Sequence, residues 1–291
     1  MNRNRVDSIF IILFRISGFL AVIILFGIFF MLVFNGIWAF KEVSLTEFFT
    51  SSSWSPSAYD KPEYGILSMV ASSILVTFLA MLIAVPIGVG AAAYLVEFAS
   101  TKVASILKPA IEMLAAIPSV TIGFLGIVLV GPFLAKLFGS SNGLNALNGA
   151  ILLAVMALPT IISISEDAMY AVPKTYKEAS LALGANRWET LVKVIIPSGS
   201  SGIIAAIMLG MGRVIGETMA VLMATGNALA MPKGIFSSVQ PLTATIAIEM
   251  GEVPYNTIHY YSLFALGVIL FLITLVINVL ADIITQRFKV K

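Results

Sequence analysis

Residues 171–197 read AVPKTYKEASLALGANRWETLVKVIIP and form the most informative polar stretch of a predominantly apolar chain. Pro173 is suited to the first turn of a helix, and residues 174–183 have the composition of a short helix. Gly184 can adopt the left-handed conformation that ends helices. The first half of this stretch therefore predicts a short helix that stops at a glycine.

The second half of the stretch carries the signals of another helix start. Asn186 can cap this helix, and Glu189, three residues later, completes a capping box. Pro197 ends the element and leads into an apolar segment. Two interpretations stay open on spacing alone. The stretch is either a capped turn whose charges face water, or a rigid helix pair with a glycine elbow that projects from the membrane.

The composition of the whole chain places it in a lipid bilayer. Of 291 residues, 59% are hydrophobic and 11% are charged, and the mean hydropathy is +1.02. A soluble domain carries about 25% charged residues. A membrane-spanning helix needs about 20 apolar residues, and six segments are long enough. We expect an all-α membrane protein with a single transmembrane domain over residues 1–291. Its spans are expected at about 9–38, 66–96, 106–138, 149–170, 199–226 and 260–284.

The first apolar segment is expected to be a retained transmembrane helix. The stretch MNRNRVDSIF is charged like the start of a signal peptide, but the apolar run after it is too long for a cleavable one. Several later spans contain or adjoin prolines, which remove a backbone hydrogen bond and kink helices. Bent helices suit a bundle that encloses a path, although proline is also commoner in membrane helices generally. These prolines are Pro86, Pro118, Pro132 and Pro159.

The distribution of lysine and arginine predicts that both termini are cytoplasmic. With the N-terminus inside, the outer segments contain Lys41, Lys61, Lys136 and Lys233, and Arg15 and Arg213 lie within spans. The cytoplasmic segments contain the other eleven positive residues, so eleven against four decides the orientation. They are Arg3, Arg5, Lys102, Lys108, Lys174, Lys177, Arg187, Lys193, Arg287, Lys289 and Lys291. The stretch 171–197 is then a cytoplasmic loop.

Several classes of function are excluded by residues that the sequence lacks. It has no basic cluster of the kind that binds nucleic acid. It has no cysteine and a single histidine, His259, so thiolate and histidine-cluster metal sites are excluded. It has no phosphate-binding G-x-x-x-x-G-K-[ST] loop, so any ATP must be hydrolysed by a separate subunit. We find no internal repeat, which weakens the interpretation as a secondary carrier.

The loop resembles the coupling motif of ABC-importer permeases. In that motif Glu-Ala-Ala is followed after three residues by Gly, and after nine more by Ile-x-Leu-Pro. Here Glu178-Ala179-Ser180, Gly184 and the VIIP of 194–197 keep the same spacing, and the substituted positions keep their small size or apolar character.

This resemblance implies a MetI-like type I permease bundle whose elbow docks in a cleft of an ATP-hydrolysing subunit. It implies that Glu178 and Gly184 shape the docking surface, while Ala179 and Ala182 are small enough for close approach. The residues expected to couple the chain to the ATPase are Glu178, Ala179, Ala182, Gly184, Asn186 and Arg187.

A second feature is the charged pair Arg213 and Glu217 within the fifth apolar segment. Arg213 lies sixteen residues beyond Pro197, roughly 24 Å along a helix. Placing a charge at that depth costs at least about 2.5 kcal/mol, so such residues face the bundle interior or a wet cavity. Residues four apart are neighbours on one helix face. The pair is therefore either a structural salt bridge or a fixed cation for a passing anion, which the carboxylate neutralises when the path is empty.

The sequence around this pair adds a second resemblance. GMGRVIGETMAV at 210–221, followed by TGN at 225–227, is similar to the fifth-span signature of phosphate ABC-importer permeases, particularly the C-type subunit of the Pst system. The likeness covers most of the chain and is strongest at 112–128 and 157–227. It implies that Arg213 and Glu217 are the polar residues of a phosphate path.

The resemblance also implies the partners and the location. They are a second, related permease subunit, two ATP-binding subunits that hold ATP and magnesium, an external phosphate-binding protein, inorganic phosphate, and the lipid of a bacterial inner membrane. This chain itself is expected to bind no cofactor and no nucleic acid, and to catalyse no reaction.

Other charged residues near the spans have weaker interpretations. Glu112, near the cytoplasmic start of the third span, is a candidate partner for Arg213 from another helix. Glu166 and Asp167, near the cytoplasmic end of the fourth span, are expected to be structural, and His259 is expected to be an interfacial residue.

Three other functions were weighed. A permease for another oxyanion, such as molybdate or sulfate, would have the same coupling loop, but the fifth-span signature argues against it. An ion-driven secondary carrier would need no docking loop. A membrane scaffold would have no reason to bury a charged pair.

Overall fold

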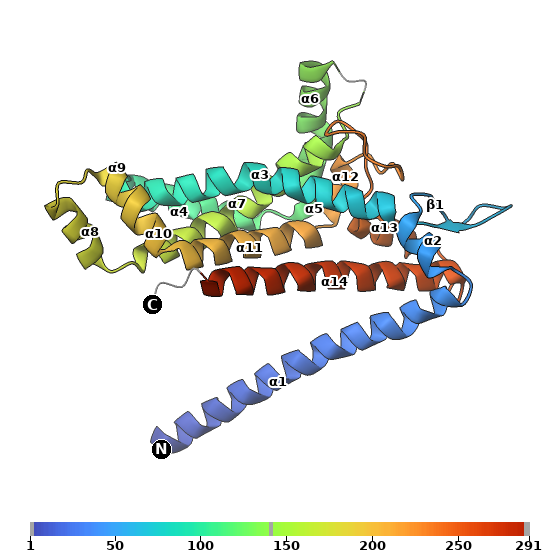
Figure 1. Cartoon of the computed structure of the whole chain (residues 1–291), viewed down its shortest axis with the longest axis horizontal. Helices are drawn as coiled ribbons and strands as arrows, with labels where there is room; N and C mark the ends of the chain where they lie inside the picture. The colour runs from blue at the N-terminus through green and yellow to red at the C-terminus, as the bar shows by residue number, and fades with distance from the viewer. Residues whose placement is uncertain (1–2, 140–141, 288–291) are drawn as a thin grey trace.

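The computed structural model describes residues 3–139 and 142–287, and it describes side chains within residues 10–139 and 142–286. These residues are mostly helical and form an elongated bundle (Figure 1). Five helices are long and apolar enough to cross a membrane, or six if one sharply bent helix pair is a single span. The prediction of an all-α membrane protein is confirmed in this part of the chain, apart from one short hairpin.

The elements up to residue 138 are as follows. They are α1 (Arg3–Gly36), the 3-10 helix η1 (Ile37–Lys41), α2 (Leu45–Thr50), β1 (Trp54–Ser55), β2 (Glu63–Tyr64), α3 (Leu67–Glu97), α4 (Thr101–Ala116), α5 (Ser119–Leu125), the π-helix η2 (Gly126–Val130) and α6 (Gly131–Phe138).

The elements after residue 141 complete the bundle. They are α7 (Ala146–Tyr170), α8 (Lys174–Ala182), α9 (Arg187–Thr190), the π-helix η3 (Leu191–Ile195), α10 (Ile196–Ser198), α11 (Ser200–Gly216), α12 (Met219–Ala224), α13 (Leu242–Glu249) and α14 (Ile258–Arg287).

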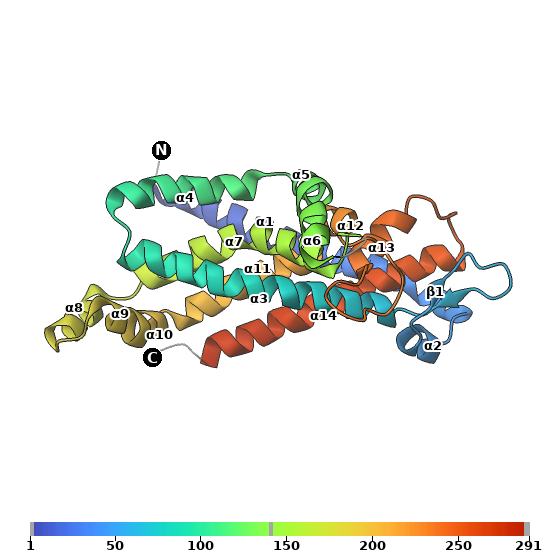
Figure 2. The same cartoon turned by 90° about the horizontal axis from the view of Figure 1, so that it is seen from above.

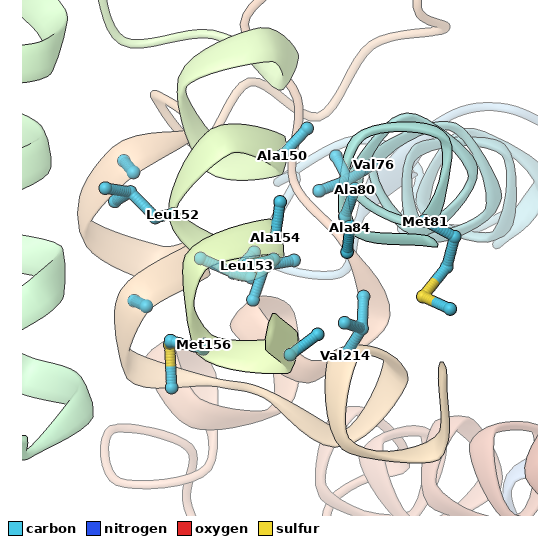
Figure 3. Close-up of a cluster of buried hydrophobic side chains, with 14 of the residues drawn as sticks. Val76, Ala80, Met81, Ala84, Ala150, Leu152, Leu153, Ala154, Met156 and Val214 are labelled. Atoms are coloured by element: carbon cyan, nitrogen blue, oxygen red, sulfur yellow. The ribbon is translucent and has the colours of Figure 1, made fainter. Parts of the chain in front are cut away.

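The centre of the bundle is formed by α3, α7 and α11, which run side by side (Figures 1 and 2). Small residues line their contacts, as membrane helices require when their backbones approach closely. On α3 and α7, the alanines 80, 84, 150 and 154 are fully or almost fully buried and lie between the two helices (Figure 3).

Two glycines set the spacing of these three helices around one side chain, Ile161 of α7. A Cβ atom at Gly88 of α3 would lie 2.6 Å from Ile161 Cγ2, and one at Gly210 of α11 would lie 2.7 Å from Ile161 Cγ1. Real Cβ atoms do not approach so closely, so α3 and α11 can each contact α7 at this depth only because they carry glycine there.

We expect Gly210→Val to destabilise the bundle, because overpacking of a filled core costs typically about 1–3 kcal/mol. The measurement is the midpoint temperature for loss of monodisperse protein in detergent. Gly212→Val is the matched control, since a Cβ at Gly212 meets no atom within 4 Å. Equal midpoints for the two variants would contradict the packing argument.

Helix α1 diverges from the rest of the bundle (Figure 1). Its main contacts are with α14, including the rings of Phe29 and Phe271, whose centroids lie 4.8 Å apart. Most of its described side chains are exposed and apolar. They require lipid or another membrane protein around them.

The predicted third span, 106–138, is broken near its middle. The chain has α4 up to Ala116, a break at Ile117 and Pro118, and a new helix from Ser119 to Phe138. This second helix runs across the direction of α3 and α14: Figure 1 shows it from the side, and Figure 2 shows it nearly end-on. The physical reason is Pro118, whose ring disfavours helical geometry in the residue before it, and Ile117 is extended with ψ of 127°.

The predicted fifth span, 199–226, is also broken. The helix of Arg187–Ser198 and the helix of Ser200–Gly216 meet at an angle of 72° at Gly199. Helix α11 then ends at Gly216, because Glu217 has an extended backbone with ψ of 133°. A separate short helix, α12, follows. The predicted span is therefore a bent entry, one helix of 17 residues and a break within the apolar segment.

Candidate functional site

The loop of residues 171–197 forms the elbow that its sequence predicts. Asn186 Oδ1 accepts a hydrogen bond from the Glu189 N–H at 2.9 Å, and Glu189 Oε2 accepts one from the Asn186 N–H at 3.0 Å. This reciprocal pair is a capping box. Gly184 has φ of +90°, which a residue with a Cβ adopts only under strain. The capping box and the left-handed glycine are confirmed.

The end of α8 is closed by two backbone hydrogen bonds. The Ala185 N–H donates to the Ser180 carbonyl at 3.2 Å, and the Gly184 N–H donates to the Leu181 carbonyl at 3.0 Å. This is a Schellman motif, which satisfies carbonyls that the end of the helix would leave free. Ser180 Oγ also lies 2.9 Å from Oγ1 of the buried Thr190, so the two limbs of the elbow are joined by side chains as well.

The elbow projects beyond the ends of the long helices (Figures 1 and 2). All six residues that the sequence predicts as coupling residues lie on its exposed surface: Glu178, Ala179, Ala182, Gly184, Asn186 and Arg187. Sequence reasoning missed two large apolar residues there. Leu183 is 89% exposed and Trp188 is 63% exposed. The available signal was an apolar side chain directly before the elbow glycine and a tryptophan in the first turn after the cap.

Arg213 lies on the open face of α11. The adjacent face of the helix contacts α7 through buried residues such as Gly210 and Val214. Leu209 is exposed, and a Cβ placed at Gly212 or Gly216 would meet no atom within 4 Å, so the side of the helix next to Arg213 is open. Arg213 itself is partly exposed. The guanidinium therefore faces a side of the bundle that this chain leaves open.

The predicted pair of Arg213 and Glu217 on one helix face is wrong. Helix α11 ends between them, and no hydrogen bond or ion pair to Arg213 occurs among residues 10–139 and 142–286. The physical reason is that Glu217 lies at the helix break and makes its hydrogen bonds with residues beyond it. Its Oε1 accepts from the Ala220 N–H at 3.3 Å in the first turn of α12, and its carbonyl oxygen accepts from Thr243 Oγ1 at 3.0 Å.

Glu217 lies at a small pocket between α3, α7, α11, α12 and the start of α13. Ser73 and Thr77 of α3 line it together with Glu217 and Thr243. Ser73 Oγ accepts a hydrogen bond from the Leu242 N–H at 3.0 Å, so α3 is tied here to the start of α13. Within the described part of the chain, Arg213 and Glu217 are thus two separate polar positions near one break.

The other predicted charges are not gathered around Arg213. Glu112 is exposed on α4 and makes no ion pair with Arg213 in the part of the chain with described side chains. Glu166 is buried and accepts from Lys108 Nζ at 3.3 Å, whereas Asp167 is exposed. The ion pair between α4 and α7 gives Glu166 a structural contact, as expected.

His259 has a more specific environment than an interfacial position predicts. Its Nε2 lies 2.6 Å from Glu249 Oε2, and Trp54 Nε1 donates to both oxygens of the same carboxylate at 3.0 Å. These contacts hold the outer hairpin of β1 and β2 against α13 and α14. Beside Trp54, burial raises the pKa of the Tyr64 phenol, and the negative charge of Glu42 raises that pKa further.

A bundle of bent apolar helices that leaves a cation on an open face and projects a capped elbow at one end defines a polytopic transport permease. The chain belongs to the family described as binding-protein-dependent transport system inner membrane component, whose model matches residues 84–290. It is therefore a multi-pass protein of the bacterial inner membrane and a subunit of an ABC-type importer.

Curated relatives match this chain over most of its length. The "Probable ABC transporter permease protein YqgH" of Bacillus subtilis is 38% identical over 280 residues, which cover 96% of this chain and 88% of that protein. The "Phosphate transport system permease protein PstC" of Mesorhizobium japonicum is 34% identical, with coverage of 98% and 91%. The PstC of Pasteurella multocida is 31% identical, with coverage of 100% and 95%.

Solved structures share the fold at low sequence identity. A chain of a bacterial ABC transporter for the acidic polysaccharide alginate has a TM-score of 0.65 at 14% identity, and the match covers 98% of this chain and 99% of that chain. A chain of the MetNI methionine ABC transporter in an inward-facing conformation has a TM-score of 0.62 at 20% identity, with coverage of 77% and 95%. The predicted MetI-like permease fold is confirmed.

Proposed function

We propose that this chain forms part of the path by which inorganic phosphate enters the cell. The observation that carries this proposal is Arg213, a cation within an apolar span that has no partner among the described side chains and faces an open side of the bundle. An arginine fork matches the oxygens of a phosphate-like anion. The relatives named as phosphate transport permeases support the choice of anion.

The open face of α11 also supports a second permease subunit. This chain alone does not enclose Arg213, and a charge within lipid needs a wet cavity or a partner around it. A related permease placed against this face would close the path, with Arg213 at the interface and Glu217 near the helix break. In that arrangement Glu217 does not neutralise Arg213 directly. Glu217 instead stabilises the helix break at the end of α11, and this break lies close to Arg213.

The elbow supports coupling to two ATP-binding subunits, one for each permease. ATP and magnesium would be held by those subunits, and this chain would contribute docking only. Leu183 and Trp188 offer the apolar contact, and the six predicted coupling residues surround them. The start of α1 and the end of α14 lie toward the elbow end of the molecule (Figure 1), which supports cytoplasmic termini. An external binding protein would deliver phosphate at the other end.

Radiolabelled phosphate uptake tests the choice of anion. A strain that lacks this subunit is expected to lose high-affinity uptake and to regain it when the gene is returned. Excess unlabelled phosphate should compete, whereas excess sulfate or molybdate should not. Competition by sulfate or molybdate as strong as that by phosphate would instead favour a permease for another oxyanion.

A further inference from the structure

The docking helix α8 has few attachments to the bundle. None of its residues is buried, and its backbone neighbours are α9 and η3, which belong to the same loop. Movement of α8 can reach α7 through the short connection 171–173 and can reach α11 through η3 and α10. Helix α3 is not adjacent to α8 in sequence, so it needs a separate contact to follow the same movement.

One ion pair provides this contact. Lys177 Nζ of α8 lies 2.6 Å from Oε2 of Glu97, the last residue of α3. The Glu97 side chain is 1% exposed, while that of Lys177 is 38% exposed. Among the hydrogen bonds and ion pairs of the described residues, this pair alone joins α8 to α3.

Glu97 is expected to lower the stability of α3. A negative charge at the C-terminal end of a helix is unfavourable to the helix dipole, and a buried carboxylate is destabilising unless it is paired. Its second oxygen, Oε1, is buried without a hydrogen-bond partner in the described part of the chain. The stability of α3 therefore does not explain this carboxylate, but a need to hold Lys177 does.

The surroundings leave room for movement. A cavity of about 270 Å³ lies beneath α8. Its lining combines mainly apolar residues of α3, α7, α8 and η3 with four charged residues, Glu97, Lys174, Lys177 and Glu178. Helix α8 therefore borders open space on the side that faces α3 and α7.

The other end of α3 reaches the polar break near Arg213. Ser73 lies 24 residues before Glu97 on one continuous helix, roughly 36 Å away at about 1.5 Å per residue. Ser73 and Thr77 line the pocket of Glu217, and Ser73 accepts from the Leu242 N–H. The single helix α3, which contains Pro86, thus connects the docking helix to the region of the path.

We infer that the Lys177–Glu97 ion pair transmits the movement of the docked elbow to α3, and that Lys177 and Glu97 are positioning residues for transport. This inference rests on the proposed docking of the elbow to an ATPase. In this mechanism α8 moves with the ATPase, and the ion pair makes α3 follow α8. The movement of α3 then reaches the break at Glu217.

The test uses the complete transporter in proteoliposomes. The binding protein is placed on the side of the vesicle that the external face of the transporter occupies. We expect Lys177→Met to assemble with its ATPase subunits, but to lower phosphate transported per ATP hydrolysed by about fivefold or more, the usual lower range of coupling between sites. Lys177→Arg should restore the ratio, because it keeps the cation. Glu97→Gln is a second variant that keeps the shape of the side chain, and it should lower the ratio in the same direction.

Lys108→Met is the matched control. Lys108 is also a half-exposed lysine, 43% exposed, paired with a buried glutamate, Glu166, that is 6% exposed, but this pair joins α4 to α7 and not to α8. It should leave the ratio unchanged. A wild-type ratio in both Lys177→Met and Glu97→Gln would overturn the inference, as would loss of the ATPase subunits from both variants. Failure of the wild-type complex to transport phosphate would instead refute the proposed function.

Discussion

Arg213→Gln is expected to lower phosphate uptake by about tenfold or more while the complex still assembles, because a hydrogen bond to a charged group contributes about 1.5–3 kcal/mol. The arginine lies beside the open side of α11, so its removal breaks no hydrogen bond or ion pair among the described side chains. The loss should therefore fall on transport and spare stability. Uptake of radiolabelled phosphate and pull-down of the ATPase subunits measure the two effects separately.

Two variants sharpen this experiment. Arg213→Lys should give intermediate uptake, because it keeps the charge but loses the two-pronged geometry of the guanidinium. Arg15→Gln is the matched control, since Arg15 is another arginine within a span, but it is exposed on the diverging helix α1. Normal uptake by Arg213→Gln, or an equal loss in Arg15→Gln, would refute the role of Arg213 in the path.

The second large effect is expected for Gly184→Val, which should lose most of the ATPase recovered with the permease. Gly184 has φ of +90°, and a β-branched residue is an outlier at positive φ. A Cβ at this position meets no atom within 4 Å, so backbone strain is the cause and crowding is not. The elbow would relax to negative φ, which changes the angle between α8 and α9 and moves Leu183 and Trp188 apart.

Controls separate strain at the elbow from strain in general. Gly139→Val places the same residue at another open position with positive φ, +66°, at the end of α6, and it should leave ATPase recovery unchanged. Gly184→Asn should recover much of the binding, since asparagine tolerates the left-handed conformation. Undiminished recovery of ATPase with Gly184→Val would count against docking through the elbow.

The elbow could be predicted in detail because its signals are local. A capping box links residues three apart, and a left-handed glycine ends the helix directly before it. The exposed positions of the six coupling residues follow from the same short segment. Leu183 and Trp188 were missed because an apolar residue in a sequence of this composition gives no sign of whether it is covered.

The charged pair in the fifth span shows where such reasoning fails. Arg213 and Glu217 have the spacing of helical neighbours, and a continuous helix would have brought them together. At the break, the Glu217 carbonyl instead accepts a hydrogen bond from Thr243, which is 26 residues away. The sequence near Glu217 contains no trace of that contact. The predicted roles of Arg213 and Glu217 in the phosphate path therefore require a separate variant at each residue.

The sequence alone determined the membrane location, the number of apolar segments, the elbow and the permease family. These features depend on composition, on the length of apolar runs and on hydrogen bonds within one turn. Only the tertiary structure decided the course of the third and fifth segments. The same holds for the open side of α11 next to Arg213 and for the link between Lys177 and Glu97. These features are set by contacts between residues far apart in the sequence, such as Lys177 and Glu97, which are 80 positions apart. The energy of such contacts depends on how whole helices pack.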